Sequence, residues 1–195
     1  MSTGKSRLLL AVPTEEKAVT GLPCIEGLSF PNGTEVKIFN CWGRVVDDAY
    51  NTIVQEALND HADYICTCED DTFAPKDAIV KLMDILRKNP KSIVGAWYPK
   101  REASKQGVHI ELIDGVRQAM PSDGTIREAY TLAMGCTLIP IEVFLQIPYP
   151  WFKTTVNLSQ DSFFSQLARE SGYQLLVDTS IKCKHIDRKT GEIFE

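Results

Sequence analysis

The stretch ADYICTCEDDTFAPKDAIVKLMDIL, residues 62–86, decides the fold. Its first seven residues, 62–68, are mostly apolar, which is typical of a buried β-strand. That strand runs straight into three consecutive acids at 69–71, and Pro75 closes the segment. After the proline, apolar residues return at the spacing of one helix face, with the proline well placed in the first turn. The stretch therefore predicts a strand, an acidic turn and an amphipathic helix.

The segments on both sides of this stretch continue the alternation of strand and helix. From Val46 onward, apolar residues recur with the period of a helix face. Such a βαβαβ order predicts a mostly parallel central sheet flanked by helices, in the α/β class. The expected strands are RLLLAV at 7–12, EVKIFNC at 35–41 and SIVGAWY at 92–98.

The second half of the chain is less regular. A Ser159 cap signal and a Gly172 stop signal delimit a clear helix over 159–172. We expect strands or hairpin arms at 107–113 and 128–139, a short helix at 141–147, a last strand at 173–179, and a polar tail from Asp187. With no repeat or linker, residues 1–195 are predicted to form a single domain.

Composition limits the possible functions. At 195 residues and 44% hydrophobic, the chain is long enough for one sizeable core. The formal net charge is −5, which argues against a general nucleic-acid coat, although a local basic channel is compatible with it. No apolar run approaches the ~20 residues of a membrane span, and the run after the N-terminal basic residues is too short for a signal peptide.

The six cysteines show no disulfide-scaffold rhythm. We therefore expect a reduced, cytoplasmic location, the host cytoplasm if the protein is viral. Cys66-x-Cys68 and Cys183-x-His185 also suggest zinc, but they lack the two-residue spacing of a zinc knuckle.

The acidic turn has two interpretations. Ligands of open parallel sheets bind beyond the carboxyl ends of the strands, where these acids should lie. Glu69 and Asp71 form an acid-x-acid pair, and Mg²⁺ or Mn²⁺ favours such oxygen ligands together with phosphate and water. The alternative is a solvated acidic loop favoured by the dipole of the following helix, because such short patterns often arise by chance.

Five blocks in order resemble GT-A-fold glycosyltransferases, most of all the family 2 enzymes and their small viral or archaeal relatives. Residues 62–86 are similar to the strand, acidic turn, proline and helix that carry the family's metal motif. The resemblance covers roughly 7–186, and its weight lies in the order and spacing of the blocks. The other four are DDAYNTIVQEALNDHADYI at 47–65, IVGAWYPKR at 93–101, AMGCTLIPIEVFLQIPYPWF at 133–152 and LSQDSFFSQLARESGYQLLVDTSIKCKHI at 158–186.

The resemblance implies a GT-A-like nucleotide-diphospho-sugar transferase fold and a metal-dependent glycosyltransferase. Such an enzyme would move a sugar, with inversion, from a nucleotide-diphosphate donor to an acceptor hydroxyl, using Mg²⁺ or Mn²⁺. A UDP-sugar is the default donor, but the carboxylate that many relatives carry near the end of strand two is Asn40 here, which leaves the nucleotide open. The implied metal ligands are Glu69, Asp71 and His185; the implied donor contacts are Pro13, Thr14, Glu15, Asn51, Asp70, Lys100 and Arg101.

The resemblance also assigns the acceptor side. It implies that Asp161 is the general base, since a positioned carboxylate can take the proton of an attacking hydroxyl. The family usually has two acids at this point, whereas this chain has Gln160 followed by Asp161. Gly135 and Trp151 are the expected acceptor contacts. Each residue has a structural alternative: a helix-dipole role for Asp161, a surface position for His185 and a packed corner for Trp151.

Two other functions stay open on sequence alone. One is a catalytically silent nucleotide-sugar-binding module. The other is a sugar-nucleotide nucleotidyltransferase, although its Gly-rich phosphate loop is absent after the first strand. The acceptor could be a polysaccharide, a protein or a hydroxymethylated base in viral DNA. A nucleic-acid acceptor would need a basic channel, for which the candidates are Arg44, Lys100, Arg101 and Lys105.

Overall fold

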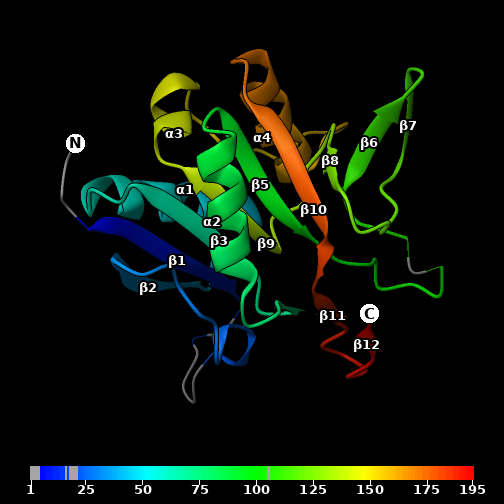
Figure 1. Cartoon of the computed structure of the whole chain (residues 1–195), viewed down its shortest axis with the longest axis horizontal. Coiled ribbons are helices and arrows are strands. Elements are labelled where there is room, and N and C mark those ends of the chain that lie inside the picture. Colours follow the sequence, from blue (N-terminus) through cyan, green and yellow to red (C-terminus); the bar gives the residue numbers. More distant parts are fainter. Residues whose placement is uncertain (1–4, 16, 18–21, 105) are drawn as a thin grey trace.

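A seven-stranded sheet forms the centre of the computed structural model, which describes residues 5–15, 17, 22–104 and 106–195 (Figure 1). The strand order is β2-β1-β3-β9-β5-β10-β8. Five strands run in one direction, and β9 and β8 run against them. The strands are β1 (Ser6–Thr14), β2 (Thr34–Trp42), β3 (Tyr64–Cys68), β5 (Ser92–Trp97), β8 (Ile126–Glu128), β9 (Cys136–Pro140) and β10 (Gln174–Lys182). The predicted mostly parallel sheet is confirmed.

Helices cover both faces of this sheet (Figure 1). Three helices, α1, α3 and α4, pack on one face, while α2 packs on the other. The buried centre of β1, residues 8–12, is entirely apolar because Leu9 and Ala11 face the first cluster and Leu8 and Leu10 face the second. The helices are α1 (Val46–Asn59), α2 (Ala78–Lys88), α3 (Glu142–Gln146) and α4 (Gln160–Glu170), with a short 3-10 turn, η1 (Pro23–Ile25), before β2.

The helix ends follow the sequence signals in one case and depart from them in another. The Ser159 hydroxyl accepts a hydrogen bond from the Ser162 N–H, and Gly172 adopts φ +80° after the last turn of α4. In contrast, α2 begins at Ala78, and Pro75 lies before the helix rather than in its first turn. None of the helices in the described part of the chain has the length and apolarity needed to cross a membrane.

The predicted polar tail is partly structured. A small sheet in the order β12-β11-β4 joins the segment after β10 to the acidic turn. His185 pairs with Thr72 in this sheet, and the Ile186 N–H donates to the Asp71 carbonyl at 2.8 Å. The strands are β4 (Thr72–Phe73), β11 (Lys184–Ile186) and β12 (Ile193–Phe194). The tail is therefore held against the end of β3, which is about a hundred residues earlier in the chain.

The middle of the chain departs most from the prediction. The segment 128–139 begins with the last residue of β8 and ends in β9, and 129–135 between them belongs to no strand. The segment 107–113 contributes the first arm of a hairpin, β6 (Ile110–Ile113) and β7 (Val116–Ala119), whose second arm was not predicted. Its turn uses Asp114 and Gly115, both with positive φ. The hairpin stands to one side of the central sheet (Figure 1).

Candidate active site

A cleft of about 610 Å³ opens where the carboxyl ends of β1 and β3 meet the start of α1. This is the edge at which ligands of α/β sheets bind. The acidic turn forms one wall of the cleft, and three arginines also line it: Arg44, which was a candidate for a basic channel, Arg101 and Arg188. Of the predicted site residues, the cleft is lined by Pro13, Thr14, Glu15, Glu69, Asp70, Asp71 and Arg101.

Asp71 is the most connected acid of the turn. Its Oδ2 atom accepts a hydrogen bond from Arg101 Nη1 at 2.9 Å and lies 3.6 Å from His185 Nε2. Burial alone would raise the pKa of Asp71, but the hydrogen bond and charge of His185 and the charge of Arg101 outweigh burial and lower it below 3.8. Asp71 is therefore a carboxylate at neutral pH.

His185 is buried and oriented by its other ring nitrogen. Nδ1 lies 2.8 Å from the Pro99 carbonyl oxygen, which can only accept, so Nδ1 must carry a proton. In the neutral ring, this leaves the lone pair of Nε2 facing the Asp71 carboxylate. Two such acceptors 3.6 Å apart suit a shared cation or a second proton on the ring.

Glu69 faces the other side of the turn. Its Oε1 atom accepts a hydrogen bond from the Tyr50 hydroxyl of α1 at 2.7 Å. Burial raises the pKa of Glu69 above 4.5 and the charge of Asp71 adds to the rise, while the Tyr50 hydrogen bond opposes it. Its role as a metal ligand beside Asp71 stays a prediction.

Asp70 forms an ion pair with Arg188, a residue of the segment that follows His185. Each aspartate of the turn thus has its own arginine, because Arg101 pairs with Asp71. Among the described residues, no group of three or more His, Cys, Asp or Glu side chains is placed to hold a metal ion by itself. Asp71 and His185 can nevertheless supply two ligands, since Mg²⁺ is usually bound by one or two carboxylates with phosphate and water.

Asp161 lies in the first turn of α4, within the electrostatic influence of Glu69, and is not among the residues that line the cleft. Its Oδ1 atom is buried and has no hydrogen-bond partner among the described residues. Burial raises its pKa well above 3.8, and the negative charge of Glu69 raises it further. Ser159, not Asp161, caps the helix. The predicted base is therefore a carboxyl group with a high proton affinity and an unused oxygen.

Asn51 requires a correction, because its amide is fully used inside the protein. Its Oδ1 atom accepts from the backbone N–H groups of Trp151 and Phe152 at 3.1 and 3.2 Å, and Nδ2 donates to the carbonyls of Phe152 and Asp47 at 2.8 Å each. An amide offers two donors and two acceptor lone pairs, so none is left for a donor nucleotide. Asn51 instead holds the 151–152 segment on α1.

Replacing Asn51 with Ala is expected to lower the free energy of unfolding by about 2–3 kcal/mol, because two buried backbone N–H groups lose their acceptor. Denaturant unfolding would measure the change. Asn59→Ala on the same helix is the matched control, since Asn59 is exposed and its loss should change the stability by less than ~0.5 kcal/mol. Equal effects of the two substitutions would contradict the conclusion that Asn51 holds the 151–152 segment on α1.

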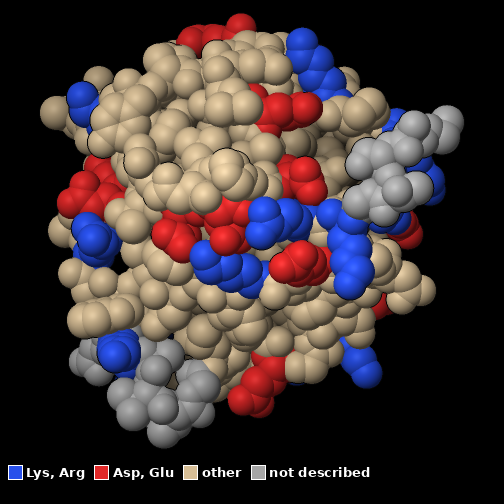
Figure 2. Space-filling model, turned by 90° about the vertical axis from the view of Figure 1, so that its left-hand side faces the viewer, with Lys and Arg blue, Asp and Glu red and all other residues tan. Residues whose placement is uncertain are grey.

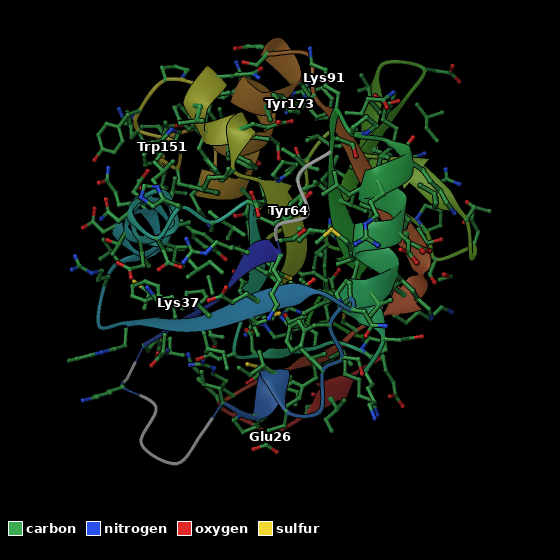
Figure 3. All side chains as sticks on the ribbon, turned by 60° about the vertical axis from the view of Figure 1, so that its left-hand side comes forward. Glu26, Lys37, Tyr64, Lys91, Trp151 and Tyr173 are labelled. Carbon is green, nitrogen blue, oxygen red and sulfur yellow. The ribbon has the colours of Figure 1, made fainter. Side chains whose placement is uncertain are left out.

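Trp151 also requires correction, and Gly135 has a structural reason of its own. Trp151 is 7% exposed, its Nε1 donates to the Phe144 carbonyl of α3 at 3.0 Å, and it packs beside that helix (Figure 3). It is the packed corner rather than an acceptor platform. At Gly135, an added Cβ would lie 2.5 Å from the Tyr98 ring and 2.7 Å from Thr72 Oγ1. The close approach of neighbouring side chains is therefore enough to require glycine here, and its contact with an acceptor stays a prediction.

Lys100 lies outside the cleft lining, and its Nζ is 3.9 Å from the Glu102 carboxylate. Its contact with the sugar donor stays a prediction. Asn40 donates to the Val12 carbonyl and to Thr14 Oγ1 at 2.9 Å each, which fixes the end of β1. Lys105, a member of the possible basic channel, lies outside the described residues.

Two polar or charged residues of the cleft lining, Tyr50 and Arg188, were not predicted as site residues. Tyr50 lies one position before Asn51, and its place in the helical period predicts a position on the apolar face. It does lie on that face, where its ring stacks on that of Phe152 with the centroids 4.8 Å apart. Arg188 follows His185 by three residues, so a basic residue beside a predicted site histidine was the available signal. Its position in a polar tail concealed it.

The chain was compared with known proteins. No protein-family model and no curated protein sequence matches it. Solved structures do match. The protein A197 from STIV has a TM-score of 0.67 at 16% identity over 96% of this chain and 93% of A197.

Two further likenesses extend to larger proteins. TarS from S. aureus has a TM-score of 0.57 at 12% identity, over 91% of this chain and 59% of the TarS chain. GalNAc-T7, solved with UDP, GalNAc and Mn²⁺, has a TM-score of 0.63 at 11% identity, over 96% of this chain and 45% of its own. This chain thus spans roughly half of each of these two. Identities this low show the fold alone, and the fold is the GT-A fold of glycosyltransferases that the five sequence blocks predicted.

Proposed function

We propose that the chain is a metal-dependent glycosyltransferase that moves a sugar from a nucleotide-diphosphate donor to an acceptor hydroxyl. The observation that carries the proposal is the arrangement around Asp71. The Asp71 carboxylate lines a cleft at the carboxyl edge of a GT-A sheet, and its Oδ2 atom lies 3.6 Å from Nε2 of the buried His185. The structures of GalNAc-T7 with UDP and Mn²⁺ and of TarS with UDP-GlcNAc support a UDP-sugar as the first donor to test.

Asp71 and His185 would hold Mg²⁺ or Mn²⁺, with the remaining ligands supplied by the donor phosphates and water. When bound, the cation neutralises charge on the departing diphosphate. His185 is prepared for this role, because the Pro99 carbonyl fixes the proton on Nδ1. Glu69, held by Tyr50, would orient the donor or serve as a further ligand.

Arg101 and Arg188 would contact the diphosphate. Both guanidinium groups line the cleft, and each now balances one acid of the turn. A cation at Asp71 would compete with Arg101 for the same Oδ2 atom, and a released guanidinium is suited to bidentate phosphate binding. The two arginines therefore allow the negatively charged diphosphate to bind beside the acidic turn.

Asp161 would act as the general base. The acceptor oxygen attacks the anomeric carbon while the bond from that carbon to the diphosphate breaks, and the hydroxyl proton passes to the carboxylate of Asp161. Attack from the face opposite the leaving group inverts the anomeric centre, and the transition state has oxocarbenium character by analogy with glycoside hydrolysis. The raised pKa of Asp161 makes it a stronger base than an ordinary aspartate.

The acceptor class is the least constrained part of the proposal. Figure 2 shows acidic and basic side chains interleaved across the middle of one face, rather than a continuous basic stripe. A hydroxyl of a polysaccharide or a protein is therefore favoured over a nucleic acid for that face, since nucleic-acid binding needs clustered positive charge.

Incubation with a panel of nucleotide sugars, with Mn²⁺, with Mg²⁺ or with a chelator, tests the proposal. We expect release of a nucleoside diphosphate from a UDP-sugar that stops when the metal is removed. Binding without release would instead indicate a silent binding module. Pyrophosphate formed from a sugar phosphate and a nucleoside triphosphate would indicate a nucleotidyltransferase.

Replacing Arg188 with Ala is expected to raise the KM for the donor about tenfold, because one charge-assisted hydrogen bond to phosphate is lost. Steady-state kinetics at saturating metal would measure it. Arg87→Ala is the matched control: Arg87 pairs with Asp84 on the exposed side of α2 and does not line the cleft. An unchanged KM in Arg188→Ala would exclude a diphosphate contact.

A further inference from the structure

Four of the six cysteines lie together beneath the acidic turn, and the proposed sugar transfer uses none of them. Each is at most 1% exposed, and all belong to the apolar cluster on the α2 face of the sheet. Three are neighbours of predicted site residues in the sequence: one precedes Glu69, one follows Gly135 and one precedes Lys184 and His185. The four are Cys66 and Cys68 on β3, Cys136 at the start of β9, and Cys183 between β10 and β11.

Cys136 is the centre of this group. The neighbouring thiols of Cys183, Cys66 and Cys68 lower the pKa of its own thiol. The four side chains therefore share one apolar cluster, with Cys136 beside the other three. Isolated buried cysteines behave as small hydrophobic residues, but sulfur atoms held together can exchange a pair of hydrogens for a bond.

Strand register singles out one pair of these thiols. Cys68 and Cys136 lie directly opposite each other on the antiparallel strands β3 and β9, whereas Cys66 lies opposite Leu138. The next pair along, Glu69 and Gly135, is hydrogen-bonded, because the Glu69 N–H donates to the Gly135 carbonyl at 2.9 Å.

Hydrogen-bonded and non-hydrogen-bonded pairs alternate along an antiparallel ladder, so Cys68 and Cys136 form a non-hydrogen-bonded pair. In such pairs the Cα atoms are about 4.5 Å apart and the side chains are close. A disulfide bridges Cα atoms about 4.4–6.8 Å apart. The backbone here thus already meets the distance requirement.

We propose that Cys68 and Cys136 form a disulfide site under the acidic turn. With a small-molecule disulfide as oxidant, one thiolate attacks an oxidant sulfur and expels a thiolate, and the second cysteine then attacks the mixed disulfide. The chain loses two hydrogens, and the oxidant is reduced to two thiols. The bond would tie the exit of β3, which leads to Glu69, to the entry of β9, which follows Gly135.

The bond would also stabilise the fold. It would close the long loop between the two strands and so restrict the unfolded chain. We expect the oxidised form to melt about 10 °C above the reduced form, and the gain to disappear on reduction.

Peptide mapping of the full-length chain tests the proposal without any activity assay. The protein is incubated with oxidised glutathione just below its melting temperature, so that local opening admits the reagent, and free thiols are then alkylated. We expect a link between Cys68 and Cys136, alkylated Cys66 and Cys183, and the higher melting temperature. Cys66→Ala and Cys183→Ala should keep the link, and Cys68→Ala should lose it.

Three results would overturn the proposal. The first is a link between Cys136 and Cys183 or Cys66 in the wild-type chain. The second is alkylation of all six cysteines in the wild-type chain after incubation with oxidised glutathione. The same result is then expected in Cys41→Ala, a control substitution on the opposite face of the sheet. The third is stoichiometric zinc bound to these thiols in the purified protein. Because the map is read on the wild-type chain, its outcome is independent of whether sugar transfer occurs.

Discussion

Replacement of Asp161 by Asn is expected to slow sugar transfer by about 10²–10⁴-fold while leaving donor binding intact, because the acceptor hydroxyl loses its base. Asparagine keeps the size of the side chain but cannot take the proton at neutral pH. Rapid-quench or steady-state transfer rates would give the loss, and calorimetry with the donor nucleotide would check binding. Asp48→Asn is the matched control, since Asp48 also lies in the first turn of a helix but is exposed.

The same substitution should stabilise the protein above acidic pH. The pKa of Asp161 is raised by burial and by Glu69, so the folded state favours its protonated form. That favourable contribution is fully present below the unfolded value of 3.8 and is lost as the pH rises through the folded pKa. Asp161→Asn should therefore match the wild type in melting temperature at low pH and exceed it at neutral pH.

These two readouts separate the roles of Asp161. A base that is held in an unfavourable charged state predicts slower transfer together with higher stability. A residue that only supports α4 through the helix dipole predicts lower stability and normal transfer. An unaffected transfer rate would return Asp161 to that structural role.

Replacement of Asp71 by Ala is expected to abolish metal-dependent donor turnover and to weaken Mn²⁺ binding beyond detection. Asp71 is the one acid of the turn that meets both Arg101 and His185, so its loss removes the carboxylate around which the site is organised. Nucleoside diphosphate release and Mn²⁺ titration would measure the two effects. Asp84→Ala, on the exposed side of α2, is the control acid.

Folding must be checked in the same variant. The pKa of Asp71 is lowered in the folded state, so its carboxylate stabilises the fold above pH 3.8, and that stabilisation is lost as the pH falls through the folded pKa. Asp71→Ala should therefore melt somewhat lower at neutral pH but keep a native circular dichroism spectrum. Turnover that persists in a folded Asp71→Ala variant would contradict the metal assignment.

The first half of the fold could be predicted because its signals are local. Strand β3, the acidic turn and α2 follow each other within 62–88, and each has a clear hydrophobic period. The order of the central strands beyond β3 could not be read in this way. Strand β9 inserts between β3 and β5, and that placement depends on contacts between residues about seventy positions apart.

The site residues also divide into those that local sequence signals predict and those that depend on contacts between distant residues. Asp71 and Arg101 lie at the ends of predicted strands, so sheet geometry alone brings them to one edge. Asn51 and Trp151 were misassigned because they contact each other: the amide of one holds the backbone of the other. A single sequence cannot show that two polar or aromatic groups satisfy each other rather than a ligand.

Arg188 is a residue of the candidate site that the sequence analysis did not identify. Its segment is polar and short, which is typical of a chain end, yet β11 and β12 fix it against the acidic turn. The pairing of β11 with β4 involves few residues and leaves no periodic pattern. Only the structure shows that Asp70 has a partner there.

Anomalous diffraction from crystals grown with a nucleoside diphosphate and Mn²⁺ tests the central claim most directly. The account predicts an Mn²⁺ peak bonded to the Asp71 carboxylate and to Nε2 of His185, with the diphosphate in the cleft and contacted by Arg101 or Arg188. A diphosphate bound elsewhere, or an Mn²⁺ peak that touches neither Asp71 nor His185, would contradict it.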